Sequence, residues 1–293
     1  INYGMCTEPE ARMVIRNLLL TTEEGLGGGE TAIFPIQIFR LKSGVNLREG
    51  DPNYDLFKLA CRVSAKRLFP NFSFQDAPFN LKYYKEGHPE TEIAYMGCRT
   101  RVIGNEVDPS REITFGRGNL SFTSINLPRI AMKVKGKELF FKELQRILEM
   151  VRDQLLERLE VQSRKQVKNF PFLMGQGVWI DSEKLSWESE VREVIKHGTL
   201  SIGFIGLAET LVVLTGKHHG ESEESQQLGL EIIRFMREFC DSESKRLHLN
   251  FSLLATPAEG LSGRFVRMDK KIYGSVPGVT DREYYTNSFH VPV

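Results

Sequence analysis

The chain has 293 residues, of which 41% are hydrophobic and 26% are charged, and this is the composition of an ordinary globular protein. Its 39 basic and 38 acidic residues leave a net charge of +1, so no nucleic-acid-binding or membrane-binding surface is indicated. No apolar run approaches the roughly eighteen residues of a membrane helix, and the first residues, INYGMCTEPEARMV, show no secretory signal.

The four cysteines, Cys6, Cys61, Cys98 and Cys240, are widely spaced and form no C-x-x-C pair. A zinc site built from cysteines of this chain is therefore not expected. In a chain of this length without a secretory signal, we expect reduced thiols and a cytoplasmic location rather than disulfide bonds.

Short apolar strands alternate with amphipathic helices, which predicts an α/β fold with a largely parallel sheet. The run TEPE at residues 7–10 resembles a helix start, and the glycines at 25–29 end that helix. They do not form a dinucleotide-binding loop, because Glu30 replaces the last glycine and a strand follows. After β-rich residues 31–40, Asp51-Pro52 predicts the cap and first position of a helix that runs to about residue 68 and packs Cys61 against the sheet. Another short strand is predicted at residues 72–74.

The second half of the chain holds the clearest helix, from Lys137 to about residue 166. Its apolar stripe consists of Phe140, Leu144, Ile147, Val151, Leu155 and Leu159. Such a helix either covers a barrel or serves a subunit interface, and the sequence favours neither.

Two strands and two helices are predicted after this helix. Residues 200–205 predict a strand that turns at Gly206 into a helix, and residues 250–255 predict another strand. Between them, a helix over residues 225–240 is expected to bury Leu228, Ile232, Phe235 and Phe239, with Cys240 beside that face as a packing or partly exposed residue. The chain shows no internal repeat and no low-complexity linker, so we expect a single domain over residues 1–293.

The segment 91–129 combines reactive side chains with little steric bulk. Cys98 follows Gly97, and Asn119 follows Gly118 in the run GRGN. Glycine beside a functional residue lets a backbone or a ligand approach closely. On these grounds alone, however, an unpaired cysteine is more often a small buried hydrophobe, and an asparagine among glycines is more often a turn residue.

Six runs, spread over nearly the whole chain, resemble the anaerobic (class III) ribonucleoside-triphosphate reductases of the glycyl-radical family. These runs are YMGCRTRV, GRGNLSFTSINLPR, NFPFLMGQGVW, HGTLSIGFIGLAE, NFSLLATPAEGLSGRF and PGVTDREYYTNSFHVPV. The resemblance implies the central part of a catalytic domain, without its N-terminal part and without the C-terminal segment that carries a structural zinc and the radical glycine. The fold it implies is part of a ten-stranded α/β barrel with a cysteine-bearing finger loop.

The resemblance implies reduction of ribonucleoside triphosphates to deoxyribonucleoside triphosphates, with Cys98 as the catalytic residue. The glycyl radical of the C-terminal segment converts the matching cysteine to a thiyl radical, which takes the 3′-hydrogen of the substrate. Such a cysteine needs a neutral thiol in a dry site, so Arg99 and Arg101 are expected to point away from it or to pair with carboxylates. Gly97 and Gly118 are expected to line the substrate site.

Asn119, the second catalytic candidate, corresponds to an asparagine of the family branch that uses formate as reductant. Its amide can donate a hydrogen bond to a carboxylate or a sugar hydroxyl without titrating. The resemblance further implies ATP and deoxynucleotide effectors, a radical-SAM iron–sulfur activase, and a homodimer in the full protein.

Thr256, Pro257, Ala258 and Glu259 follow a predicted strand and allow two interpretations. Their spacing matches a capping box and a helix that starts with proline. The run ATPAEG also resembles the reductase segment that receives the substrate phosphates, and a helix start offers N–H groups and the positive end of the helix dipole. In that arrangement Glu259 is expected to turn back to the cap.

The remaining candidates are histidines. His218-His219 could form a metal site, but a solvated helix start is the better interpretation because adjacent histidines point apart on a helix. His197 and His290 are either buried hydrogen-bonding residues or members of a pocket.

Three other functions stay open. A glycyl-radical lyase with two adjacent catalytic cysteines is disfavoured because Arg99 follows Cys98. A truncated nucleotide-binding fragment without activity of its own is compatible with the lack of a radical glycine. A phosphate-binding α/β protein without radical chemistry would require the motif matches to be coincidental.

Overall fold

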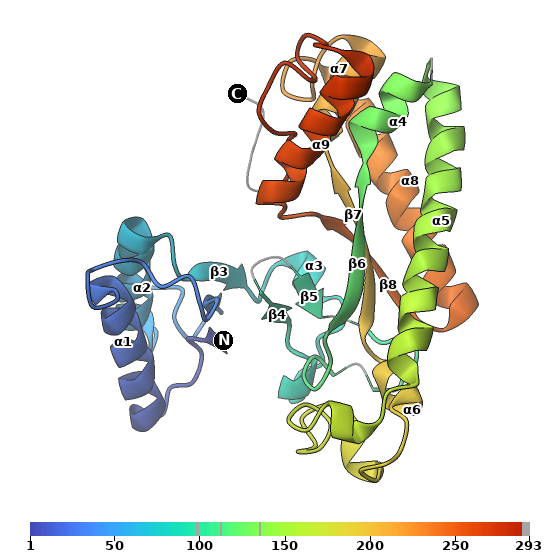
Figure 1. The fold of residues 1–293 in the computed structure, drawn as a ribbon. Coiled ribbons are helices and arrows are strands. Elements are labelled where there is room, and N and C mark those ends of the chain that lie inside the picture. The colour runs from blue at the N-terminus through green and yellow to red at the C-terminus, as the bar shows by residue number, and fades with distance from the viewer. Residues whose placement is uncertain (98–99, 103, 112, 135, 289–293) are drawn as a thin grey trace. The chain divides into compact units, whose positions relative to one another are not determined.

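The computed structural model describes residues 1–97, 100–102, 104–111, 113–134 and 136–288. The chain divides into two compact units, which are described separately: Ile1–Gly104 with Pro109–Phe115, and Asn105–Asp108 with Gly116–Val293. Both units combine helices with a parallel sheet, which confirms the predicted α/β class (Figure 1). The ten-stranded barrel, and the single barrel domain over residues 1–293, stay predictions.

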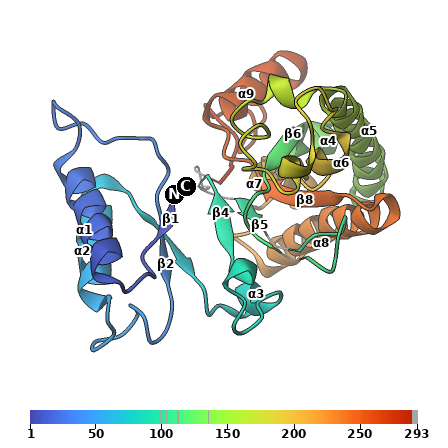
Figure 2. The same ribbon diagram turned by 90° about the horizontal axis from the view of Figure 1, so that it is seen from below.

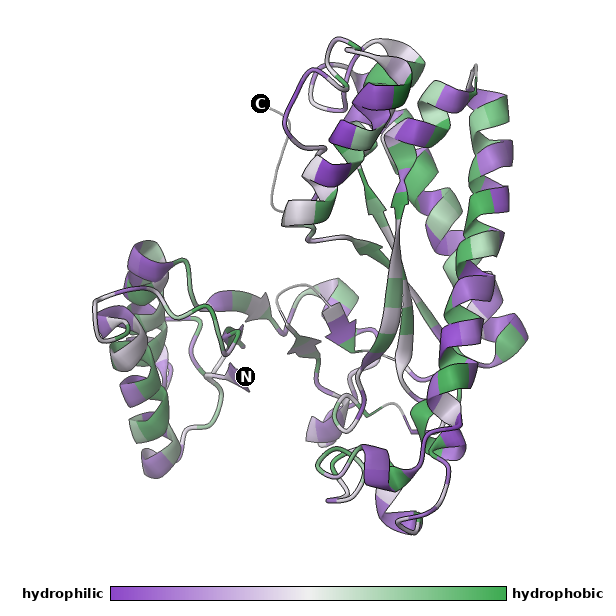
Figure 3. Cartoon of the chain, in the orientation of Figure 1, coloured by the Kyte–Doolittle hydropathy of each residue, from purple (hydrophilic) through white to green (hydrophobic). Residues whose placement is uncertain are grey.

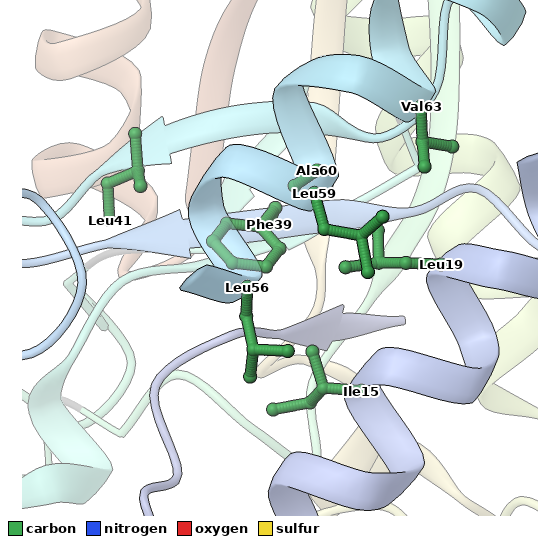
Figure 4. Close-up of a cluster of buried hydrophobic side chains, with 8 residues drawn as sticks. All are labelled: Ile15, Leu19, Phe39, Leu41, Leu56, Leu59, Ala60 and Val63. Atoms are coloured by element: carbon green, nitrogen blue, oxygen red, sulfur yellow. The ribbon is translucent and has the colours of Figure 1, made fainter. Parts of the chain in front are cut away.

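The first unit is built on a parallel sheet of three short strands in the order β1 (Asn2–Tyr3), β2 (Ile38–Leu41) and β3 (Asn71–Phe74). Helices α1 (Pro9–Glu24) and α2 (Tyr54–Arg67) pack against each other. The core of this unit gathers side chains from both helices and from β2 (Figure 4); these are Ile15, Leu19, Phe39, Leu41, Leu56, Leu59, Ala60 and Val63.

The start of α2 differs from the prediction. Asp51 accepts a hydrogen bond from the Arg48 N–H at 2.8 Å and belongs to the preceding turn. The side chain of Asn53 donates to the Gly4 and Cys6 carbonyl oxygens, which anchors the chain just before the first helical residue, Tyr54. Cys61 is exposed, so its predicted packing against the sheet is wrong.

The first unit also contains the antiparallel pair β4 (Ala94–Met96) and β5 (Thr100–Val102), in which Met96 lies opposite Thr100. Short helices precede the pair at α3 (Pro78–Leu81) and, as one 3₁₀ turn, at Pro89–Thr91. Cys98 lies between the two strands in the sequence, but it falls outside the described residues, as does Arg99.

The second unit is built on a parallel sheet in the order β6 (Asn119–Asn126), β7 (Thr199–Ile205) and β8 (Asn250–Ala255), where two strands were predicted at nearly these positions. The long helices α5 (Lys137–Ser163) and α8 (Glu223–Leu247) lie alongside β6 and β8 (Figure 1, Figure 2). Figure 3 shows both hydrophobic and hydrophilic residues along these helices, as expected for helices that cover a core. The other α-helices in the described part of this unit are α4 (Leu127–Lys133), α6 (Arg192–Ile195), α7 (Leu207–Thr215) and α9 (Glu259–Tyr273), and short 3₁₀ helices lie at Val167–Asn169 and Ser182–Lys184.

The buried faces of the long helices are close to those predicted. In α5 the buried face includes Leu148 instead of the predicted Ile147, which is only half-buried. In α8 the buried face includes Met236 instead of the predicted Phe235, and Cys240 is fully buried. In the described part of the chain, no helix has both the length and the apolar character needed to cross a membrane.

Candidate functional site

The carboxyl ends of β6, β7 and β8 lie side by side in the second unit. Asn126 pairs in register with Ile205, and Phe204 pairs with Ala255. In open parallel sheets, ligands bind beyond these ends of the strands. The run from Thr256 to Glu259 begins at this edge, directly after β8.

Thr256 is buried and held in place on both sides. Its N–H donates to the Phe204 carbonyl oxygen at 3.1 Å, and its hydroxyl lies 2.8 Å from the Ser124 hydroxyl of β6. Between them, Gly203 of β7 leaves the space that this contact needs, because a Cβ there would lie 2.2 Å from the Thr256 hydroxyl oxygen. The strand end is thus tied across all three strands.

The predicted capping box at Thr256 is wrong. Helix α9 begins at Glu259, and the preceding residue, Ala258, provides no side-chain cap. Because the Thr256 hydroxyl points to Ser124, it does not cap the helix, and Pro257 lies before the helix instead of starting it. The N–H groups of the first turn of α9 therefore receive no side-chain hydrogen bond from the capping position. The Glu259 side chain, which was expected to turn back to the cap, is not among the described parts of the structure.

Asn119 lies at the other end of the sheet. It is the first residue of β6, it is exposed, and it pairs in register with Thr199. The Gly118 carbonyl oxygen before it accepts a hydrogen bond from Thr199 N–H at 2.9 Å. From Asn119 to Ser124, which contacts Thr256, the strand advances by roughly 17 Å. The structure therefore does not bring Asn119 and Thr256 into contact.

A buried polar cluster, which the sequence did not reveal, anchors the run that leads to Asn119. Arg117 Nε donates to the His197 carbonyl oxygen at 3.0 Å, and His197 Nδ1 lies 3.1 Å from the Asn105 amide nitrogen. The Asn250 amide donates to both Asn105 Oδ1 and the His197 carbonyl oxygen. Burial lowers the pKa of Arg117 to about 10, so this guanidinium stays charged at neutral pH. His197 is thus a buried hydrogen-bonding residue, one of the two roles expected for it.

The described residues nearest to Cys98 in the sequence are Gly97 and Thr100. Gly97, which precedes it, has a positive φ of 57° and open space where a side chain would be. Arg101 donates to the Asn80 side-chain oxygen at 2.7 Å and lies over the Phe79 ring. Whether it points away from the Cys98 thiol, the other expected arrangement, stays a prediction because Cys98 lies outside the described residues. His290 lies outside the described residues.

The two adjacent histidines are not at a helix start. His218 and His219 lie in a turn, and α8 begins later, after Ser222 caps it by accepting a hydrogen bond from Ser225 N–H. Among the residues that the structure describes, no group of three or more His, Cys, Asp or Glu side chains is arranged to hold a metal ion.

Comparison with known proteins gives a consistent result over the whole chain. A family model for anaerobic ribonucleoside-triphosphate reductase matches residues 1–293. The chain is 35% identical to the anaerobic ribonucleoside-triphosphate reductase of Escherichia coli (strain K12), over 99% of the chain and 40% of that protein. It is 34% identical to that of enterobacteria phage T4, over the whole chain and 47% of that protein.

Solved structures agree at the level of the fold. The anaerobic ribonucleotide reductase from Thermotoga maritima in complex with dATP and CTP matches with a TM-score of 0.61 and 15% sequence identity, over 95% of this chain and 41% of that chain. The chain spans less than half the length of these relatives. Because the family model matches the chain from end to end, the chain belongs to the anaerobic ribonucleoside-triphosphate reductase family.

Proposed function

We propose that this chain is the central part of a catalytic domain that reduces ribonucleoside triphosphates to deoxyribonucleoside triphosphates by thiyl-radical chemistry, with formate as reductant. The observation that carries the proposal is the start of α9, which has no side-chain cap and lies at the carboxyl ends of three parallel strands in a chain of this family. The reaction is expected in the cytoplasm.

The substrate phosphates are assigned to the start of α9. The N–H groups of its first turn and the positive end of the helix dipole favour a negatively charged ligand. Thr256 and Pro257 set the direction from which the helix begins, and Ala258 adds no bulk beyond a methyl group.

Cys98 is assigned the hydrogen-transfer role. The radical glycine of the longer protein would take the thiol hydrogen atom of Cys98 and would lose it again to the thiyl radical after turnover, so it would not be consumed. Cys98 gives up its thiol hydrogen atom, takes the 3′-hydrogen of the substrate, and returns it at the end. In between, the C2′–O bond breaks and the 2′-hydroxyl leaves as water with one added proton. Formate gives up its hydrogen with two electrons and becomes carbon dioxide, and C2′ gains that hydrogen. Gly97 gives the backbone before Cys98 freedom to bend and leaves room for the sugar.

Asn119 is assigned to formate. Its amide can donate to a carboxylate and remains neutral through the reaction, so it adds no charge to a radical site. The buried cluster of Arg117, His197, Asn105 and Asn250 fixes the run before it. Gly118, next to Asn119, has no side chain that would occupy the space needed by the substrate.

Several partners belong to the longer protein that this proposal requires. They are a structural zinc and the radical glycine on a C-terminal segment, ATP and deoxynucleotide effectors, a radical-SAM iron–sulfur activase, and a second subunit. The anaerobic ribonucleotide reductase from Thermotoga maritima has been solved in complex with dATP and CTP, which supports nucleotide ligands for the proposed protein.

The test is product formation by the gene product that carries these residues, activated under strict anaerobiosis by an iron–sulfur activase. We expect formate-dependent conversion of CTP to deoxy-CTP, and complete loss of that product in Cys98→Ala. Cys61→Ala is the matched control, because Cys61 is an exposed helix residue of the first unit. Product formation that survives Cys98→Ala would refute the assigned chemistry, and activity without formate would refute the assigned reductant.

A further inference from the structure

The segment after α9 returns to the carboxyl ends of β7 and β8. Gly206 N–H, at the end of β7, donates to the Thr286 carbonyl oxygen at 2.7 Å. The Tyr285 ring packs in one buried cluster with Ile205 and Ala258. The Asn287 amide donates to the Tyr285 carbonyl oxygen at 3.1 Å and lies 3.5 Å from the Ala258 carbonyl oxygen, so this side chain reaches the residue just before the first turn of α9.

Glu209, one of two fully buried carboxylates that hold this segment, lies in the first turn of α7. It accepts hydrogen bonds from the Thr286 hydroxyl at 2.8 Å and from the Thr286 N–H at 3.1 Å. Arg282 Nη1 donates to the same carboxylate at 2.8 Å. Both partners belong to the returning segment, so this carboxylate ties it directly to α7.

The second fully buried carboxylate is Asp269 of α9. It accepts hydrogen bonds from the Tyr285 hydroxyl at 2.9 Å and from the Asn126 amide at 2.8 Å, and it forms an ion pair with Arg129. Burial and the neighbouring Asp269 charge raise the pKa of Tyr285, so the phenol stays protonated and can donate. Asp269 thus joins the returning segment to the end of β6 and to α9.

Burying two carboxylates to hold a loop has a cost in free energy. Removing a charge from water costs several kcal/mol, and apolar side chains of similar volume often give equal or greater stability. What the charged contacts add is direction, because each carboxylate oxygen accepts hydrogen bonds only along certain lines. The hydrogen bonds of Glu209 and Asp269 fix Tyr285 and Thr286, the residues immediately before Asn287.

We propose that Glu209 and Asp269 are positioning residues of the substrate site, which hold the Asn287 amide beside the start of α9 as one wall of the phosphate site. This inference rests on the proposed function, which places the substrate phosphates there. The Ala258 carbonyl oxygen is the more distant of the two acceptors of this amide, and a phosphate oxygen would take its place without any charge being added by the protein. The specificity it provides is for a triphosphate over a ligand without phosphates.

The test compares two ligands, CTP and cytidine, in the unactivated gene product that carries this chain. Glu209→Gln keeps the shape of the side chain but removes the charge that holds Thr286 and Arg282. We expect the Kd for CTP to rise roughly tenfold, a change of about 1.4 kcal/mol, with little change in the Kd for cytidine. The control is Glu283→Gln, an exposed carboxylate of the same segment, which should leave both values unchanged.

A general loosening of the structure would weaken both ligands alike, so the ratio of the two Kd values separates positioning from stability. If Glu209→Gln does not fold, Tyr285→Phe gives the same comparison, because it removes only the hydroxyl group that donates a hydrogen bond to Asp269. An unchanged ratio in the folded variant would overturn this inference and leave the proposed function intact. A wild-type protein that does not bind CTP would instead contradict the proposed function itself.

Discussion

Gly203 shows how closely the candidate site depends on a single residue. The Thr256 and Ser124 hydroxyls meet across β7 only because Gly203 has no side chain, since a Cβ would lie 2.2 Å from one hydroxyl oxygen and 2.9 Å from the other. The sequence gives no sign of this requirement, because glycine within a strand is compatible with a bulge, a bend or a close approach.

The variant Gly203→Ala should lower the free energy of unfolding by about 1–3 kcal/mol, because the added methyl group has to displace Thr256 from the strand ends. Urea denaturation followed by circular dichroism measures the change. The control is Gly260→Ala in α9, where a Cβ meets no atom within 4 Å and alanine favours the helix. Equal stability of the wild type and Gly203→Ala would contradict the tight packing described here.

The burial of the Cys240 thiol leads to a second prediction for a single residue. Burial raises the pKa of this thiol to about 12, from an ordinary value of 9.0. Because the folded state favours the protonated thiol, its contribution to stability is complete below pH 9 and is lost as the pH rises towards 12.

At pH 8, we therefore expect iodoacetamide to modify exposed Cys6 much faster than Cys240 in the folded protein. Mass spectrometry of the digested protein gives both rates. In urea, where the burial is lost, the two rates should become similar. Equal rates in the folded protein would show that the Cys240 thiol is accessible and would contradict its burial.

At the scale of elements, periodicity predicted helices better than it predicted their ends or exact faces. The start of α1, the strand-to-helix turn at Gly206 and the position of β8 follow the sequence closely. The predicted helix ends were wrong where a side chain had a partner far away in the sequence. Thr256 was expected to cap α9 and instead contacts Ser124, which is 132 residues away in the sequence.

The face of α5 gives a prediction of its own. Leu148→Ala should lower the free energy of unfolding by about 2–5 kcal/mol, because it leaves a cavity beneath a fully buried helix position. Ile147→Ala, which replaces the half-buried neighbour that the periodicity favoured, should cost clearly less. Urea denaturation of both variants gives the comparison, and a larger loss for Ile147→Ala would show that α5 packs with the face predicted from the sequence.

For the whole molecule, the α/β class and the parallel strands were accessible from the sequence, and the polar clusters were not. The bonds among Asn105, Arg117, His197 and Asn250 join residues up to 145 positions apart, and no local pattern records such a contact. The hydrogen bonds of Glu209 and Asp269 could not be predicted either, because in the sequence both residues resemble ordinary helix carboxylates and their partners lie in the distant segment after α9. Family resemblance supplied Cys98 and Asn119, since composition and spacing alone favoured structural roles for both.

The central claim, that Cys98 exchanges a hydrogen atom with the sugar of a ribonucleotide, is tested most directly by tritium release from CTP labelled at the 3′ position. The measurement uses the activated gene product under anaerobic conditions. Because Cys98 returns the hydrogen atom to the sugar, only the tritium that exchanges with water while it is held on the thiol is released. We expect this partial release by the wild type, none by Cys98→Ala, and partial release by Asn119→Ala together with loss of the deoxynucleotide product. Release that persists in Cys98→Ala would contradict the account.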